Sequence, residues 1–89
     1  GATLRLEARV APWLAEILAE TPLADDQQLV PSGEDFRLTA TVADSWQLRW
    51  WILSQGAGMT VLEPDTLRRE ITQTLKRILK GYRATTTEV

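Results

Sequence analysis

Two stretches of strict alternation between apolar and polar residues constrain the fold of this chain most. In residues 3–10 (TLRLEARV) every second residue is apolar, and the same holds for residues 36–42 (FRLTATV). A period of two is typical of a β-strand with one buried and one open face. The sequence therefore predicts a sheet with an apolar face packed against helices and a polar face in solvent.

The stretch 51–64 (WILSQGAGMTVLEP) predicts a helix end, a glycine break, a short strand and the start of a last helix. Gly56 is expected in the left-handed conformation that often ends a helix, because glycine has no Cβ to clash there. Pro64 is expected to close the strand and to occupy the first turn of the next helix. The segment after this stretch is expected to pack back over the sheet.

The remaining segments complete the order β-α-β-β-α-β-α. We expect helices over 12–20, about 45–55 and 65 to about 82, and an edge strand over 27–30 that is joined to the 36–42 strand by a glycine turn. Asp44 is the expected N-cap of the second helix. This order predicts an α+β fold, a ferredoxin-like βαββαβ arrangement with an added C-terminal helix, whose four-stranded antiparallel sheet has one open face.

Length and composition bound the possible functions. The 89 residues predict one domain over 1–83 and a disordered tail over 84–89. The absence of Cys and His excludes disulfides and thiol or imidazole metal ligands, so neither a metal nor a cofactor is expected. Catalysis would depend on hydroxyl, carboxylate or lysine groups at turns and wet helix faces, and we expect no enzyme activity. No apolar run approaches a membrane span, so we expect a cytoplasmic protein without membrane contact.

Charge is distributed unevenly along the chain. Residues 1–45 carry three Arg against eight Asp and Glu, a net charge of −5, and residues 46–89 carry seven Lys and Arg against four Asp and Glu, a net charge of +3. The pattern indicates a polarised surface. It is too weak to favour nonspecific DNA binding, which is typical of strongly basic domains.

Three arginines are the candidate ligand-binding residues. Arg5, Arg9 and Arg37 project from the open face of strands that the predicted order makes neighbours. Guanidinium groups bind phosphates and carboxylates through paired hydrogen bonds, so these residues predict contact with nucleic acid or another anion. The alternative is that Glu7 and other carboxylates pair with them across the strands. The face lacks the aromatic residues on which single-stranded nucleic acid usually stacks.

Two tryptophans are the candidate interface residues. Neighbouring residues of a helix point about 100° apart, so Trp50 and Trp51 do not share the centre of one buried stripe. Trp46 and Trp50 are therefore predicted to serve a partner surface, since Trp is enriched at interface hot spots. The alternatives are that all four Trp fill the core, and that the basic residues of the last helix form only a solvated face.

The residues LRL at 4–6, WILSQG at 51–56, VLEP at 61–64 and LR at 67–68 resemble the WYL C-terminal extension, called WCX. Tyr82 also fits this pattern. The likeness covers nearly the whole chain. One departure is Gln55, where the family commonly has an aromatic residue such as Phe, which affects packing under the glycine turn.

The resemblance implies a function that periodicity does not. It implies the C-terminal domain of a bacterial transcription regulator, typically a homodimer, with a helix-turn-helix and a WYL domain upstream of Gly1. The WYL domain, of the same or the partner protomer, is the expected partner, an oligonucleotide or nucleotide is the expected effector, and operator DNA is contacted through the upstream helix-turn-helix. The other hypothesis is a stand-alone ferredoxin-like module that binds a small molecule.

Overall fold

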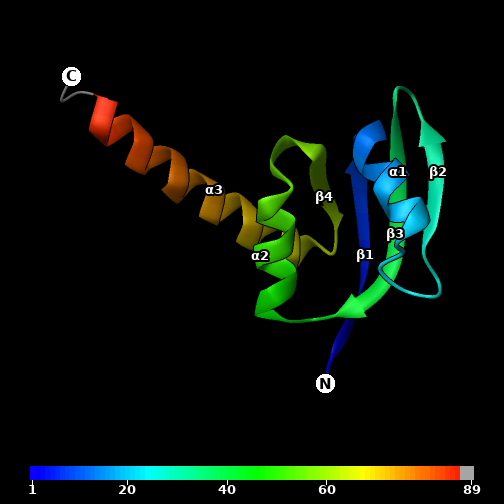
Figure 1. The fold of residues 1–89 in the computed structure, drawn as a ribbon. Helices are drawn as coiled ribbons and strands as arrows, with labels where there is room; N and C mark the ends of the chain where they lie inside the picture. The colour runs from blue at the N-terminus through cyan, green and yellow to red at the C-terminus, as the bar shows by residue number, and fades with distance from the viewer. Residues whose placement is uncertain (87–89) are drawn as a thin grey trace.

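The computed structural model describes residues 1–86 as a four-stranded sheet with three helices (Figure 1). The mixed α+β class, the antiparallel sheet and the number of helices are as the sequence predicted. The elements, in chain order, are β1 (Thr3–Val10), α1 (Pro12–Glu20), β2 (Gln28–Ser32), β3 (Asp35–Ala43), α2 (Trp46–Ser54), the short 3-10 helix η1 (Gly56–Gly58), β4 (Met59–Glu63) and α3 (Asp65–Thr86).

The sheet has the strand order β2-β3-β1-β4, and every neighbouring pair is antiparallel. The long central strands β1 and β3 pair along their whole length, from Thr3 opposite Ala43 to Val10 opposite Phe36. The strand β2 forms one edge and contains Pro31, which lies opposite Phe36. β4 forms the other edge.

The core lies between one face of the sheet and the helices, as the alternation predicted. Leu6, Ala8 and Val10 of β1 have no exposed surface. They pack in one cluster with side chains from every helix and from β3 and β4: Leu14, Ala15, Leu18, Leu38, Leu48, Ile52, Met59, Val61, Leu67 and Ile71. Figure 1 shows α1 in front of β1 and β3, and α2 beside β4. Within residues 1–86, no helix lies over the opposite sheet face.

The second helix begins one residue later than the sequence predicted. Ser45, not Asp44, is the N-cap of α2, and its Oγ accepts a hydrogen bond from the Leu48 backbone N–H at 3.2 Å. The Asp44 carboxylate instead accepts from the Arg49 guanidinium. A serine hydroxyl caps as well as an aspartate, and pairing with Arg49 gives the Asp44 carboxylate a charged partner.

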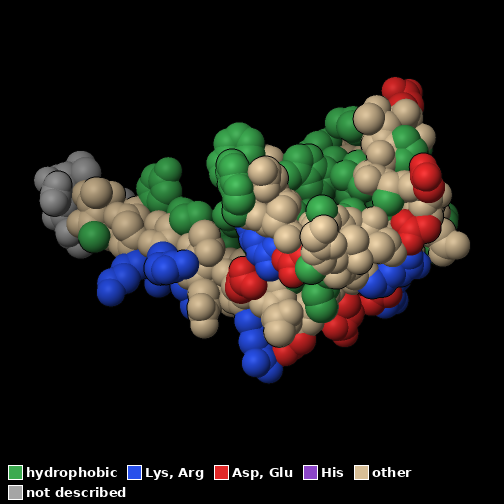
Figure 2. Space-filling model, turned by 90° about the horizontal axis from the view of Figure 1, so that it is seen from below, with side chains coloured by type: hydrophobic (Ala, Val, Ile, Leu, Met, Phe, Trp, Pro, Cys, Tyr) green, Lys and Arg blue, Asp and Glu red, His purple; other side chains and the backbone are tan. Residues whose placement is uncertain are grey.

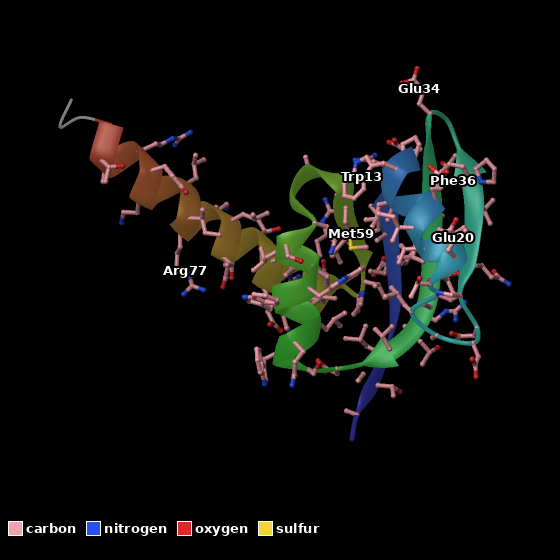
Figure 3. All side chains as sticks on the ribbon, viewed as in Figure 1. Trp13, Glu20, Glu34, Phe36, Met59 and Arg77 are labelled. Atoms are coloured by element: carbon pink, nitrogen blue, oxygen red, sulfur yellow. The ribbon has the colours of Figure 1, made fainter. Side chains whose placement is uncertain are left out.

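The glycine break after α2 has the predicted geometry. Gly56 has a φ of +58°, in the left-handed region. Gly58 approaches α1 so closely that an added Cβ would lie 2.3 Å from Cζ2 of Trp13. Figure 3 shows Trp13 at the start of α1, beside this turn and near Met59. The small residues of this turn thus let α1 and β4 pack together.

The last helix departs from the expectation that it packs back over the sheet. Its start lies against β4, but its far part projects beyond the rest of the domain (Figure 1). It also continues through Thr86, into the segment 84–89 that was predicted to be disordered, because no glycine or proline stops it after Gly81 and the Thr85 hydroxyl bonds the Gly81 and Tyr82 carbonyls. The rest of that predicted tail, 87–89, lies outside the described residues.

Candidate functional site

The arginine face is the open side of β1 and β3 that carries Arg5, Arg9 and Arg37. The register places Arg9 directly opposite Arg37, and Arg5 opposite Thr41. The three side chains are each a little over half exposed. The structure therefore brings all three predicted residues onto one accessible surface.

A carboxylate pairs with each arginine of this face. Arg37 binds Glu7 through two contacts, from Nε to Oε1 at 3.1 Å and from Nη2 to Oε2 at 2.9 Å. The hydrogen bond from Arg37 lowers the pKa of Glu7 and raises the pKa of Arg37. Arg9 lies 3.9 Å from the Asp35 carboxylate. The alternative of cross-strand pairing with carboxylates, stated from the sequence, is thus present in the structure.

Asp26 has a role that the sequence did not reveal. Its carboxylate accepts from the Thr41 hydroxyl at 2.6 Å and from the Thr41 backbone N–H at 2.9 Å, and it pairs with Arg5 at 2.8 Å. These hydrogen bonds from Thr41 lower the pKa of Asp26. β2 begins only opposite Thr39, so the loop carboxylate replaces a strand partner for Thr41. No period or motif marks such a contact across 15 residues.

The arginine face is therefore close to neutral. Three guanidinium groups are balanced by three carboxylates within 4 Å. An anion at this surface would share the guanidinium donors with these carboxylates, because arginine has five donors and the pairs leave some of them facing solvent. Anion binding by Arg5, Arg9 and Arg37 stays a prediction, developed below.

The tryptophan pair of α2 lies on the outer side of the helix layer. Trp46 is 72% exposed and Trp50 is 69% exposed, four residues apart on the same side of the helix. Trp51 is half-buried against the core, and Trp13 packs over Gly58. The two tryptophans predicted at an interface are thus the two most exposed, although no contact of theirs with a partner is part of the structure.

A groove of about 400 Å³ separates α1 from the end of α2. It is lined by Leu14, Ile17, Leu18, Thr21, Pro22, Leu23, Trp51 and Gln55. Gln55, the departure from the family pattern, donates its amide N–H to the Trp51 carbonyl at 3.2 Å. Gln55 and Thr21 thus add polar groups to a groove that is lined mainly by apolar side chains.

The far part of α3 carries exposed apolar residues whose exposure sequence reasoning missed. We define the α3 stripe as Leu75, Ile78, Leu79 and Tyr82, all of them 45% exposed or more. The lengths of the last helix and the last strand could have revealed this exposure. A helix of 22 residues is about 33 Å long, whereas the five-residue β4 covers only about 17 Å. The sheet edge is too short to cover the whole helix.

Other kinds of site are absent from the part of the chain that the structure describes. Residues 1–86 contain no cluster of three or more His, Cys, Asp or Glu side chains that could hold a metal ion. Across the same residues, no helix combines the length and apolar character that a membrane span requires.

The described residues thus present a sheet face of balanced ion pairs and a helix side of exposed apolar and aromatic residues. The WCX domain family model matches residues 2–79. The chain therefore belongs to the WCX domain family, which is a family of regulatory domains and not of enzymes. A search of the curated proteins finds no match for this chain.

Proposed function

We propose that this chain is the C-terminal regulatory and dimerisation domain of a WYL-type helix-turn-helix transcription regulator. The family match over residues 2–79 carries the proposal. The exposed tryptophans support a partner surface, and the arginine face supports a role in sensing a nucleic acid or nucleotide effector. A regulator of transcription in bacteria acts in the cytoplasm. Its partners are the WYL domain, a second protomer and, through the upstream helix-turn-helix, operator DNA.

The proposed mechanism couples two sites. An effector phosphate that binds Arg5 or Arg37 competes with Asp26 or Glu7 for the guanidinium donors. Glu7 belongs to β1, and Asp26 ties its loop to Thr41 of β3. Release of either carboxylate from its arginine therefore changes the surface that meets the WYL domain. Differential effector affinity for two dimer geometries then changes operator affinity by the same coupling free energy.

A ferredoxin-like fold is part of the same proposal. The element order β-α-β-β-α-β supports it, as does the central position of β1 between β3 and β4. In this arrangement the second layer is on one side of the sheet, and the arginine face stays available to ligands.

The sensing role is tested by titrating the intact regulator with short oligonucleotides and measuring fluorescence anisotropy. Arg5→Ala combined with Arg37→Ala is expected to weaken binding. The slope of log affinity against log salt concentration is expected to become shallower by about 0.7 for each lost phosphate contact. Arg69→Ala combined with Arg77→Ala removes the same charge from α3 and is the matched control. Equal affinity of the sheet variant and the wild type would refute the sensing role.

A stand-alone ferredoxin-like module that binds a small molecule is the second candidate, because the α1–α2 groove of about 400 Å³ has a volume typical of ligand pockets. A thermal-shift screen of metabolites against the isolated chain tests it. A saturable rise in Tm that Ile17→Trp abolishes would support this function. If no metabolite raises Tm, the small-molecule function is refuted.

A further inference from the structure

The α3 stripe continues a face that is buried in the first turns of the helix. Leu67 is 1% exposed and Ile71 is 8% exposed, and both pack in the core. Leu75 and Ile78 follow at the same spacing of three and four residues, but they lie beyond the sheet and are about half exposed. The same side of α3 is thus buried in the core at the start of the helix and exposed to solvent at its far end.

The lysines of α3 lie away from this stripe. Lys76 and Lys80 each fall about 160° around the helix from Ile78 at 100° per residue, whereas Arg77 falls about 100° from it, at the edge of the stripe. Figure 2 shows hydrophobic side chains along one side of the projecting helix and Lys and Arg along the other. In Figure 3, Arg77 points outward from the far part of α3. Two copies that meet through the stripe therefore keep Lys76 and Lys80 on their outer sides.

The tryptophan pair extends the same apolar surface. Arg49 of α2 binds Glu70 of α3, so the two helices lie side by side at the start of α3. A Trp side chain has roughly 150–250 Å² of surface, and Trp46 and Trp50 are each about 70% exposed. Together with the stripe they approach the roughly 800 Å² that each partner of a stable protein interface buries.

The far part of α3 has an exposed side chain, Leu75, and a shallow hollow one turn further along the helix. The hollow, of about 310 Å³, is lined by Arg77, Ile78, Gly81, Tyr82 and Thr85. Positions 78, 81, 82 and 85 have the i, i+3, i+4, i+7 spacing of a hole in knobs-into-holes packing. Gly81 deepens it, since no atom lies within 4 Å of where its Cβ would be. Leu75, one turn before the hollow, is the knob.

We infer that the far half of α3 pairs antiparallel with α3 of a second copy of this chain. Leu75 of each copy enters the hollow around Gly81 of the other, and Ile78 meets Leu79 at the two-fold axis. The C-terminal end of each α3 then reaches Trp46 and Trp50 in α2 of the other copy. A symmetric pair needs such a self-complementary surface. The inference rests on the dimerisation part of the proposed function and assigns it a surface.

The test measures the mass of this chain in solution by light scattering across a concentration series. The wild type is expected to be dimeric at high micromolar concentration. Ile78→Glu places a charge at the axis and is expected to raise the dissociation constant at least about 30-fold, the effect of a hot spot. Lys80→Glu, about 160° around the helix from Ile78 at 100° per residue and not part of the lining of the hollow, is the matched control and is expected to stay dimeric. Unchanged circular dichroism verifies that each variant folds.

Gly81→Leu separates pairing from folding. Leucine is a better helix former than glycine and meets no atom in the single chain, so the helix is expected to be at least as stable. The same side chain fills the hollow and is expected to dissociate the dimer. A Gly81→Leu chain that is as dimeric as the wild type would overturn the knob-and-hollow register.

The chain has no cysteine, so an introduced thiol reports on its own position alone. Leu79→Cys is expected to form a disulfide with its own copy at the axis. Leu75→Cys is not, because the two copies of residue 75 lie about 10 Å apart along the helices, beyond the roughly 7 Å limit between Cα atoms. Leu75→Cys combined with Tyr82→Cys is expected to cross-link. Equal cross-linking by both single variants would indicate parallel helices and overturn the inference.

The outcomes separate this inference from the proposed function. A dimer that Ile78→Glu leaves intact overturns the α3 assignment but agrees with pairing through another surface. A chain that is monomeric at every concentration also overturns the α3 assignment, while the oligonucleotide titration of the intact regulator still tests the sensing role by itself.

Discussion

Arg49 of α2 and Glu70 of α3 are joined by two parallel contacts, from Nε to Oε2 at 3.0 Å and from Nη2 to Oε1 at 3.2 Å. The same guanidinium binds Asp44 and donates to the Ser45 carbonyl at 3.0 Å. The hydrogen bonds to Glu70 and Asp44 raise the pKa of Arg49, and the hydrogen bond from Arg49 lowers the pKa of Glu70. One arginine thus connects the start of α2 with the start of α3 and orients the projecting helix.

Replacing Arg49 is expected to loosen that connection. Arg49→Met removes the paired contacts with Glu70 together with the contacts to Asp44 and the Ser45 carbonyl. It should lower the free energy of unfolding by about 1–2 kcal/mol, since the pair with Glu70 is partly exposed. Arg49→Lys should recover only part of it, because an ammonium does not reproduce the paired geometry. Urea unfolding measures both. Arg69→Met, in an exposed pair with Asp65, is the control, and a loss as large as that of Arg49→Met would contradict the prediction.

Adding a methyl group at Gly58 is expected to displace Trp13. The new Cβ would lie 2.3 Å from the ring, so the ring must move outward. Gly58→Ala should cost about 1–2 kcal/mol in the free energy of unfolding, as overpacking does, and should increase the quenching of tryptophan fluorescence by acrylamide. Ala57→Ser, at the exposed neighbour, should change neither quantity. Equal stability of Gly58→Ala and the wild type would show that the close approach is not required.

Asp26 is expected to make the domain sensitive to acid. Its pKa is lowered in the folded state by Thr41, so its contribution to stability is fully present above the ordinary aspartate pKa of about 4 and is lost as the pH falls through the folded value. The wild type should therefore lose stability on acidification, and Asp26→Asn should lose less. Urea midpoints at neutral and acidic pH measure this difference.

The control for that experiment is Asp25→Asn, at the exposed neighbouring position. It should follow the wild type at every pH. If Asp26→Asn and the wild type lost the same stability between neutral and acidic pH, the Thr41 contacts would not be responsible for the acid sensitivity. Glu7, whose pKa is also lowered in the folded state, should add an effect of the same sign.

Removing the exposed tryptophans is expected to leave the fold intact. Trp46→Ser combined with Trp50→Ser should change the free energy of unfolding of the monomer by no more than about 0.5 kcal/mol for each site. Trp51→Ser, at the half-buried neighbour, should cost about 3 kcal/mol or more. Thermal unfolding at low protein concentration separates the two. A large loss in the double variant would place these rings in the core.

Alternation predicted the sheet well because it reports burial directly. Residues 3–10 and 36–42 have the predicted inward and outward sides, and Gly56 has the predicted positive φ. The cap of α2 was predicted wrongly because Asp44 and Ser45 are both good caps. The choice between them depends on Arg49, which lies one turn further along the chain.

The candidate site was only partly predictable. Helix geometry predicted that the tryptophans of α2 are not all buried but did not decide which are exposed; the structure shows that they are Trp46 and Trp50. The positions of Arg5, Arg9 and Arg37 followed from the strand period. The partners of the arginines did not, because Asp26 reaches β3 from a loop and no local pattern encodes that contact. The exposed end of α3 was missed because periodicity reports which side of a helix is apolar, and not how far its neighbour extends.

The proline at the edge of the sheet limits how this domain can associate. Pro31 in β2 has no backbone N–H, so an added strand would lack one hydrogen bond of its ladder at that edge. The opposite edge offers only the five residues of β4. Lateral growth of the sheet, the route by which many β-containing domains aggregate or recruit peptides, is thus disfavoured, and side-chain contacts between helices are the more accessible form of assembly.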